Sequence, residues 1–302
     1  MEKQKVVFIL GPTGVGKTNL SVKLAKVLNG QIISADSVQV YKGFDIGSAK
    51  VTTDEMQGIK HYGIDIKEPN EEFSVFDYVN FTKERIAEIA RAGHLPIIVG
   101  GTGLYVKALI ENYNFGDASK NDAIRQKIED EITLNGQEAV YNKLVSIRPD
   151  LAQKLDKNNK PRLVRAMEIA LSGGKQTSRE SEYDFKIFAL NLDREKLYER
   201  INLRAEIMLK NGLVKEVKSL YERYGMVQGM RAIGYKEIVS CLDGQISEEE
   251  ALNLVKQHSR NYAKRQLTFL RTMKNVEFVD AENQEEAFNK MYEEIKSWIV
   301  LK

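Results

Sequence analysis

The chain has 302 residues, 42% of them hydrophobic, which is long enough to bury a sizeable core in one large domain and a smaller one. Its 45 basic and 43 acidic residues nearly balance, which excludes a protein that attracts nucleic acid over its whole surface. The single cysteine, Cys241, excludes an intramolecular disulfide and a zinc site built from several cysteines. The first residues lead into a short apolar stretch, so we expect no signal peptide and no membrane span, but a soluble cytoplasmic protein.

The first hundred residues alternate between predicted strands and predicted helices. Short apolar runs at residues 6–10, 31–34 and 96–99 indicate buried strands. Apolar residues at helical spacing predict helices at 19–28 and around 75–92. This alternation is typical of an α/β fold with a mostly parallel sheet and helices on both faces.

The pattern changes after about residue 115. Residues 117–185 are rich in charge, helical in period and without a strand-like run, so we interpret them as a helical insertion domain. Strand character returns at 186–190, and the rest is mainly helical apart from a short strand at 276–279. We therefore predict a core made of residues 1–116 and 186–302, with the insertion between two strands of its sheet.

A phosphate-binding motif follows the first predicted strand and opens the first predicted helix. It reads Gly11-Pro12-Thr13-Gly14-Val15-Gly16-Lys17-Thr18 and fits the P-loop pattern G-x-x-x-x-G-K-[ST]. Its glycines let the backbone wrap around an anion, so that N–H groups of the loop and the helix start point at phosphate oxygens. Lys17 adds a positive charge, and the Thr18 hydroxyl suits Mg²⁺. The predicted fold is thus α/β, a P-loop-containing core plus a helical insertion domain.

Two further segments are predicted to lie at the same edge of the sheet as the P-loop. Asp36 follows the second predicted strand, and Gly100-Gly101-Thr102-Gly103 follows the third. The Asp36 carboxylate could bind Mg²⁺ through water or accept a proton from a nucleophile. Thr102 could donate a hydrogen bond to a phosphate or leaving-group oxygen, and Gln39 could pair with a base edge. Many nucleotide hydrolases have an acidic residue where Thr102 stands, so its absence weighs against an ordinary ATPase.

Basic residues gather on two predicted helices. Arg200 and Arg204 lie one helical turn apart, and an Arg brought to the P-loop would clamp phosphate, although spacing alone leaves this open for Arg204. Residues 251–276 contain six Lys or Arg and no Asp or Glu. Lys256, Arg260 and Lys264 recur there every four residues, which predicts a basic stripe suited to a phosphate backbone.

Seven blocks of the sequence, in this order, closely resemble the tRNA dimethylallyltransferase (tRNA isopentenyltransferase) family of the bacterial type. They are Gly11 to Thr18; Ser34-Ala35-Asp36-Ser37 with Gln39-Val40-Tyr41; Asp45-Ile46-Gly47 with Ala49-Lys50; Gly100 to Tyr105; Leu197-Tyr198 with Arg200-Ile201 and Arg204; Ile233-Gly234-Tyr235-Lys236-Glu237; and Tyr262-Ala263-Lys264-Arg265-Gln266. The resemblance runs from about Val6 to Arg271. The chain departs from it at His61-Tyr62, where the family often has two histidines, and at Thr268-Phe269, where it often has Thr-Trp.

The resemblance implies a reaction: the dimethylallyl group of dimethylallyl diphosphate moves to N6 of the adenosine 3′-adjacent to the anticodon, and diphosphate is released. It implies that the diphosphate lies on Gly11, Pro12, Thr13, Gly14, Val15, Gly16, Lys17 and Thr18. Lys17, Thr18 and Arg204 would neutralise it together with Mg²⁺. Asp36 would take the N6 proton, and Thr102 would lie beside the leaving oxygen. Both roles agree with the chemistry, because an aromatic amine needs a base and a leaving diphosphate needs positive charge.

By the same resemblance the macromolecular partner is the anticodon stem–loop of tRNA. The residues expected to contact it are Asp36, Ser37, Val38, Gln39 and Thr102 near the site, Arg125, Lys160, Arg162 and Arg165 in the insertion, and Lys256, Arg260, Lys264 and Arg265 in the basic stripe. No membrane and no protein partner is required, and we expect a monomer.

Three other functions fit part of the pattern. A P-loop small-molecule kinase would use Asp36 as the base for a hydroxyl substrate, and an RNA-binding protein could carry a P-loop only for regulation. An adenylate isopentenyltransferase, which prenylates free nucleotides, shares the P-loop half of the sequence. The basic stripe and the insertion favour tRNA as the acceptor.

Overall fold

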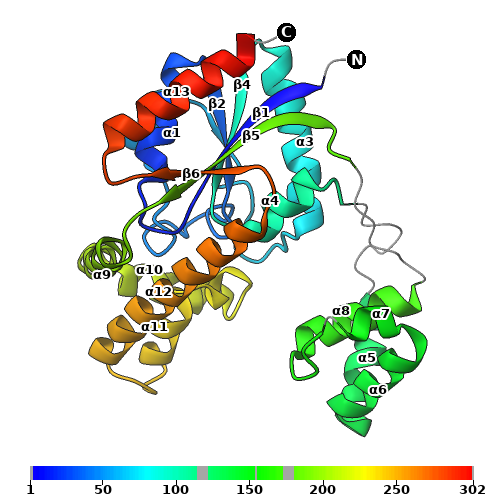
Figure 1. Cartoon of the computed structure of the whole chain (residues 1–302). Helices are drawn as coiled ribbons and strands as arrows, with labels where there is room; N and C mark the ends of the chain where they lie inside the picture. Colours follow the sequence, from blue (N-terminus) through cyan, green and yellow to red (C-terminus); the bar gives the residue numbers. More distant parts are fainter. Residues whose placement is uncertain (1–2, 114–121, 154, 173–179, 301–302) are drawn as a thin grey trace. The chain divides into compact units, whose positions relative to one another are not determined.

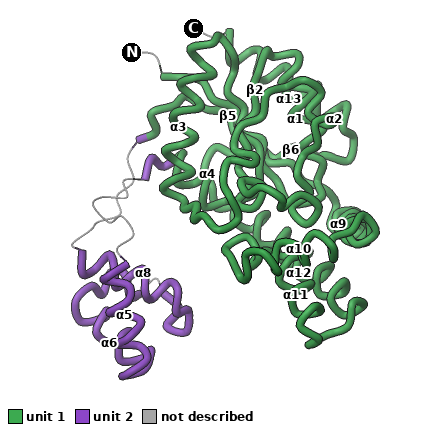
Figure 2. The backbone as a smooth tube through the Cα atoms, turned by 180° about the vertical axis from the view of Figure 1, so that it is seen from behind, with its two compact units in different colours: residues 1–110, 181–302 green, residues 111–180 purple. Residues whose placement is uncertain are grey.

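The computed structural model describes residues 3–113, 122–153, 155–172 and 180–300. They form two compact units (Figure 2): unit 1 is made of residues 1–110 and 181–302, and unit 2 of residues 111–180. Unit 2 is the predicted helical insertion, but the predicted bounds of 117–185 are wrong at the end. Residues 183–185 begin a strand that pairs with the first strand of unit 1. The Tyr-Asp-Phe stretch escaped the sequence pattern because only the following residues form an apolar run.

Unit 1 is built around a six-stranded sheet with the order β3-β2-β4-β1-β5-β6, and all of its strand pairs are parallel. In that order the strands are His61–Tyr62, Gly30–Ala35, Leu95–Gly100, Gln4–Leu10, Tyr183–Asn191 and Val276–Asp280. The predicted parallel α/β core is confirmed. Only β3 was not predicted, because two residues are too few to produce a periodic pattern.

Helices cover both faces of the sheet (Figure 1), which explains why its strands read as continuous apolar runs. Helices α1 (Lys17–Val27) and α13 (Gln284–Val300) lie on one face, and α3 (Val75–Arg91) and α4 (Gly103–Ile110) lie on the other. The short α2 (Thr53–Met56) packs beside α1. The sheet is therefore buried, and only its edges and the ends of its strands are open to ligands.

A group of helices follows β5 in the sequence and packs near the carboxyl ends of the strands (Figure 1). They are α9 (Arg194–Lys210), α10 (Leu213–Tyr224), the 3₁₀ turn η1 (Gly229–Arg231), α11 (Tyr235–Leu242) and α12 (Glu248–Thr272). Asp193 caps α9, with Oδ1 accepting from the N–H groups of Glu195 and Lys196. The long α12 contacts α9, α11 and α4, so it connects this group with the sheet edge.

Unit 2 consists of helices in its described residues, as predicted. They are α5 (Asp122–Asn135), α6 (Gln137–Ile147), α7 (Pro149–Ala152) and α8 (Lys160–Leu171). Ile128, Val140, Leu144, Leu163 and Met167 form its own buried core. Across the described ranges of both units, no helix combines the length and apolar character needed to cross a membrane.

Candidate active site

Three loops meet at one edge of the sheet because three parallel strands end there together. The register pairs Leu10 of β1 with Gly100 of β4, and Gly100 with Ala35 of β2. The P-loop, Asp36 and Thr102 directly follow these strand ends, as predicted. β4 lies between β1 and β2, and the Thr102 N–H donates to the Ala35 carbonyl over 3.1 Å. The strand that leads to Asp36, β2, is therefore not the direct neighbour of the P-loop strand β1, because β4 lies between them.

The P-loop has the backbone conformation that its glycines permit. Gly14 and Gly16 have φ of 81° and 98°, a region that side chains with a Cβ rarely adopt. Lys17 folds back over the loop, and its Nζ donates to the carbonyls of Gly11 and Pro12 over 2.9 and 2.8 Å. Burial lowers the pKa of Lys17 to about 7; the positive charge of Arg204 adds to this shift and nearby Asp36 opposes it.

Arg204 reaches the P-loop from α9, which the sequence left open. Its Nη1 donates to Thr13 Oγ1 over 2.9 Å, and its Nη2 approaches the Ser48 carbonyl at 3.5 Å. Burial lowers the pKa of Arg204 from its ordinary value, partly offset by Asp36. Because an arginine stays protonated in proteins, the site holds a permanent positive charge beside the loop. Arg200, by contrast, is exposed to solvent.

Gln266 holds the other side of Thr13, a role that sequence reasoning missed. Its Oε1 accepts from the Thr13 N–H over 3.0 Å, and its Nε2 donates to the Gly101 carbonyl over 3.0 Å. A Cβ on Gly101 would lie 2.1 Å from that Nε2, so a glycine is needed there. Gln266 thus links the P-loop, the loop before α4 and helix α12. Its place in the block around Tyr262 was the only signal available in the sequence.

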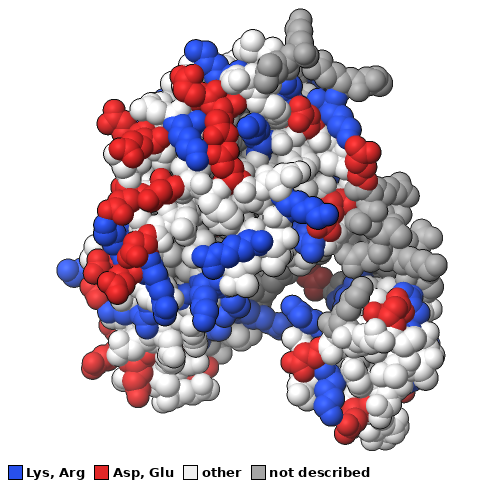
Figure 3. Space-filling view, viewed as in Figure 1, with Lys and Arg blue, Asp and Glu red and all other residues white. Residues whose placement is uncertain are grey.

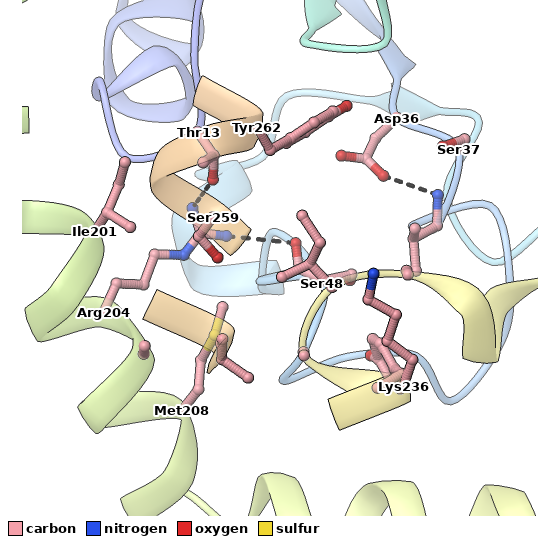
Figure 4. A pocket seen from close by; sticks show the side chains of 18 of the residues that line it. Thr13, Asp36, Ser37, Ser48, Ile201, Arg204, Met208, Lys236, Ser259 and Tyr262 are labelled. Atoms are coloured by element: carbon pink, nitrogen blue, oxygen red, sulfur yellow. Dashed lines mark hydrogen bonds between the residues drawn. The ribbon is translucent and has the colours of Figure 1, made fainter. Parts of the chain in front are cut away.

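The two carboxylate oxygens of Asp36 have different surroundings. Its Oδ1 accepts from the N–H groups of Val38 and Gln39 over 2.8 and 3.2 Å, as in an Asp that caps a turn. Its other oxygen points into the adjoining cavity (Figure 4). The carboxylate is therefore held in place by one oxygen while the second one faces the space where a substrate would lie.

Tyr262 faces the Asp36 carboxylate from α12 (Figure 4). Burial raises the pKa of Tyr262 to about 12, and the charge of Asp36 adds to the increase. The phenol therefore stays protonated and can donate a hydrogen bond at neutral pH. Thr102 Oγ1 accepts from the Ser37 N–H over 3.2 Å, and the Thr102 hydroxyl also lies within hydrogen-bonding reach of Tyr262. Sequence reasoning assigned no site role to Tyr262.

Two cavities adjoin at these residues. The P-loop cavity, about 420 Å³, is lined among others by Gly14, Lys17, Thr18, Asn19, Ile64 and Gln266. The helix cavity, about 370 Å³, is lined by parts of α9, α12 and the segment from Arg231 to Lys236 (Figure 4). Both share the walls Thr13, Asp36, Ser48, Arg204 and Tyr262. A molecule in one cavity can therefore meet a molecule in the other at the Asp36 carboxylate.

Gln39 contacts neighbouring residues at the P-loop cavity. Its Nε2 donates to the carbonyls of Ser48 and Ala49 over 3.4 and 3.2 Å, and its Oε1 accepts from Ser34 Oγ over 3.4 Å. It lines the P-loop cavity and not the helix cavity. Its amide group thus has protein contacts on both sides, and its pairing with a base edge stays a prediction. Ser37 and Val38 do line the helix cavity.

Only part of the predicted basic stripe is open to a ligand. Lys and Arg side chains gather along α12 (Figure 3). However, Lys256 pairs with Glu206 at 2.6 Å, and Arg260 donates to Asn202 over 2.6 Å, so these two side chains attach α12 to α9. Contact of Lys256 and Arg260 with RNA stays a prediction. Lys264 and Arg265 are exposed, and Arg265 also lines the helix cavity.

Of the four residues of unit 2 that are expected to contact tRNA, two form ion pairs within the unit and two are exposed to solvent. Arg125 and Arg165 both donate to Glu168 Oε2, over 3.0 and 2.7 Å, and this carboxylate is fully buried. The two arginines therefore compensate a buried charge within the unit. Lys160 and Arg162 are exposed at the start of α8, and their contact with RNA stays a prediction.

The fold and the site define a P-loop protein whose phosphate cradle adjoins a second cavity next to a basic helix. The family model described as IPP transferase matches residues 39–273. This chain therefore belongs to the IPP transferase family.

Relatives and solved structures agree with this membership. The chain is 45% identical over 294 residues to the tRNA dimethylallyltransferase of Bacillus mycoides, covering 94% of this chain and 92% of the relative. It is 44% identical over 304 residues to that of an Exiguobacterium species, covering 99% and 98%. The crystal structure of tRNA isopentenylpyrophosphate transferase from Bacillus halodurans matches with a TM-score of 0.76, 43% identity and coverage of 98% and 96%. A eukaryotic dimethylallyltransferase acting on tRNA matches with a TM-score of 0.81, 29% identity and coverage of 94% and 75%.

Proposed function

We propose that this protein transfers the dimethylallyl group of dimethylallyl diphosphate to N6 of the adenosine 3′-adjacent to the anticodon of tRNA. It is a prenyl-transferring enzyme of a family whose named relatives act on tRNA. The observation that carries the proposal is the meeting of the two cavities at Asp36, Arg204 and Tyr262. A donor on the P-loop and a base in the helix cavity would face each other there. Because its substrate is tRNA, we expect the enzyme to act in the cytoplasm.

The P-loop cavity suits the diphosphate of the donor. Loop N–H groups, Lys17 and Arg204 supply hydrogen bonds and positive charge where the leaving group gains negative charge. Thr18, Asp36 and Glu55 line the same cavity, and their oxygens are of the kind that Mg²⁺ prefers beside phosphate and water. They fit a magnesium ion held mainly by the diphosphate, and among the described residues no cluster forms a cage of three or more metal ligands. When bound, Mg²⁺ would neutralise charge on the diphosphate.

The reaction breaks the bond between C1 of the dimethylallyl group and the diphosphate oxygen, and it forms a bond between C1 and N6. The N6 proton passes to the Asp36 oxygen that faces the helix cavity. This base is needed because the N6 lone pair is delocalised into the adenine ring, which makes the amine a poor nucleophile. The Thr102 hydroxyl, at the wall of the helix cavity, would donate a hydrogen bond to the departing oxygen.

The helix cavity suits the flipped adenine. The base has to leave its stack in the anticodon loop, at a cost of about a few kcal/mol, before it enters a pocket. The exposed Lys264 and Arg265 are suited to the surrounding phosphates, which would offset part of this cost. A free nucleotide would gain less from these charges, so they favour the tRNA acceptor.

A transfer assay with labelled dimethylallyl diphosphate tests the proposal. Unmodified tRNA, a transcript without the adenosine 3′ to the anticodon, AMP and ATP serve as parallel acceptors. We expect label in the tRNA and none in the altered transcript. Label in AMP or ATP alone would identify an adenylate isopentenyltransferase. ATP turnover without prenyl transfer would identify a kinase and refute the proposal.

A further inference from the structure

Two sequence blocks without an assigned role meet at one carboxylate of α10. Glu216 Oε2 accepts from the N–H groups of Asp45 and Ile46 over 3.2 and 2.7 Å, and its Oε1 accepts from the Gly47 N–H over 3.1 Å. The same Oε1 accepts from the Tyr235 hydroxyl over 2.7 Å. Four donors thus converge on two oxygens. Only an ionised carboxylate accepts hydrogen bonds at both oxygens and offers no hydrogen of its own to these donors.

The Tyr235 ring lies directly against Gly47. A Cβ on Gly47 would lie 2.5 Å from Cε2 of that ring, so the two segments touch where they both reach Glu216. Tyr235 is fully buried, and burial together with the charge of Glu216 raises the pKa of its phenol well above the ordinary value. The hydroxyl therefore stays a donor to Glu216 throughout the physiological pH range.

The two joined segments form adjoining parts of the wall of the helix cavity. Gly47 and Ser48 line it from one segment, and Gly234, Tyr235 and Lys236 line it from the other. Ser48 also offers the carbonyl that Arg204 approaches. Glu216 does not line either cavity, so its effect on a substrate has to act through these walls.

We propose that Glu216 is a positioning residue that holds these two wall segments together and thereby sets the place of the acceptor base relative to Asp36. This inference rests on the proposed function, in which the helix cavity holds adenine. Misplacing a reacting group by about 1 Å can cost about a hundredfold in rate, so the expected effect falls on turnover. The P-loop is built without Glu216, and diphosphate affinity should be unaffected.

The test compares three variants. Glu216→Gln keeps the size of the side chain but places an NH₂ group among four donors, so at least one of the bonds is lost. Tyr235→Phe removes the hydroxyl and keeps the ring against Gly47. Glu222→Ala is the matched control, because Glu222 is exposed on the same helix and pairs only loosely with Lys218, at 3.9 Å.

In multiple-turnover assays at saturating substrates, we expect E216Q to lower kcat about ten- to a hundredfold and Y235F about threefold to tenfold. The affinity for inorganic diphosphate should change less than about twofold in both variants, and E222A should match the wild type. Equal kcat in E216Q and the wild type would refute the inference. So would a parallel loss of kcat and diphosphate affinity, since this would indicate general damage to the fold.

A second measurement does not depend on catalysis. Hydrogen exchange of the peptide that contains residues 45–47 should be slow in the wild type and about tenfold or more faster in E216Q, because Glu216 accepts from these three amides. Unchanged exchange in E216Q would refute the Glu216 contact even if tRNA prenylation is confirmed. Absence of prenyl transfer by the wild type would instead refute the proposed function and leave the exchange result standing.

Discussion

The affinity for diphosphate is expected to depend on pH through Lys17. Burial lowers the pKa of Lys17 to about 7 in the free site, so that raising the pH from 7 to 9 removes its proton. A neutral amine still has two N–H groups, and these match its two bonds to the Gly11 and Pro12 carbonyls. A bound diphosphate favours the charged amine and raises its pKa again. Binding therefore takes up a proton above pH 7, and affinity is lost as the pH rises.

The expected loss of diphosphate affinity can be calculated from the lowered pKa of Lys17. One pH unit above the pKa costs about 1.4 kcal/mol, because the amine must regain its proton before it can act as a cation. At pH 9, two units above the free-site value of about 7, the cost is about 2.7 kcal/mol, or about a hundredfold in the dissociation constant. Below pH 7 the lysine is already charged in the free site, and this contribution to the pH dependence disappears.

Calorimetric titration with inorganic diphosphate at fixed Mg²⁺ measures this dependence. Diphosphate itself titrates in the same range, so each affinity is compared with that of Lys17→Ala at the same pH, and the difference isolates the lysine. Lys23→Ala is a control, because Lys23 is exposed on α1. Titrations in buffers of different ionisation enthalpy should show uptake of about one extra proton at pH 9. Parallel pH profiles for the wild type and K17A would refute the reasoning.

Three further substitutions test the site. Asp36→Asn should lower turnover about 10²- to 10⁴-fold with nearly unchanged tRNA affinity; normal turnover would exclude Asp36 as the base. Gln266→Leu removes the bonds to Thr13 and Gly101. It should destabilise the fold by about 1–3 kcal/mol and weaken diphosphate binding, measured by thermal unfolding and calorimetry, and an unchanged melting temperature would contradict this. Lys264→Glu should weaken binding of the anticodon stem–loop and reduce its salt dependence by about one counterion; wild-type binding at low salt would show that Lys264 only faces solvent.

The sequence by itself determined the features that depend on neighbouring residues. A P-loop is encoded by consecutive residues, because its glycines permit the backbone conformations that the loop requires. A buried strand is encoded by a short apolar run. For the same reason the Asp193 cap at the start of α9 and the helical character of the insertion could be predicted. Parallel strands also end at a common edge, so the presence of Asp36 and Thr102 beside the P-loop followed from their positions after two strands.

Only the tertiary structure decided which side chains meet across long separations in the chain. Thr13 is joined to Arg204 and to Gln266, from 191 and 253 residues away, and no local pattern encodes such pairs. Helical periodicity shows that Lys256 and Lys264 share a face of α12, but not that Glu206 covers one of them. A hydrogen bond or ion pair requires two groups at one point in space. The packing of α9, α10 and α12 onto the sheet edge brings these groups together, and it therefore distinguishes the residues that shape the site from those left free to bind a substrate.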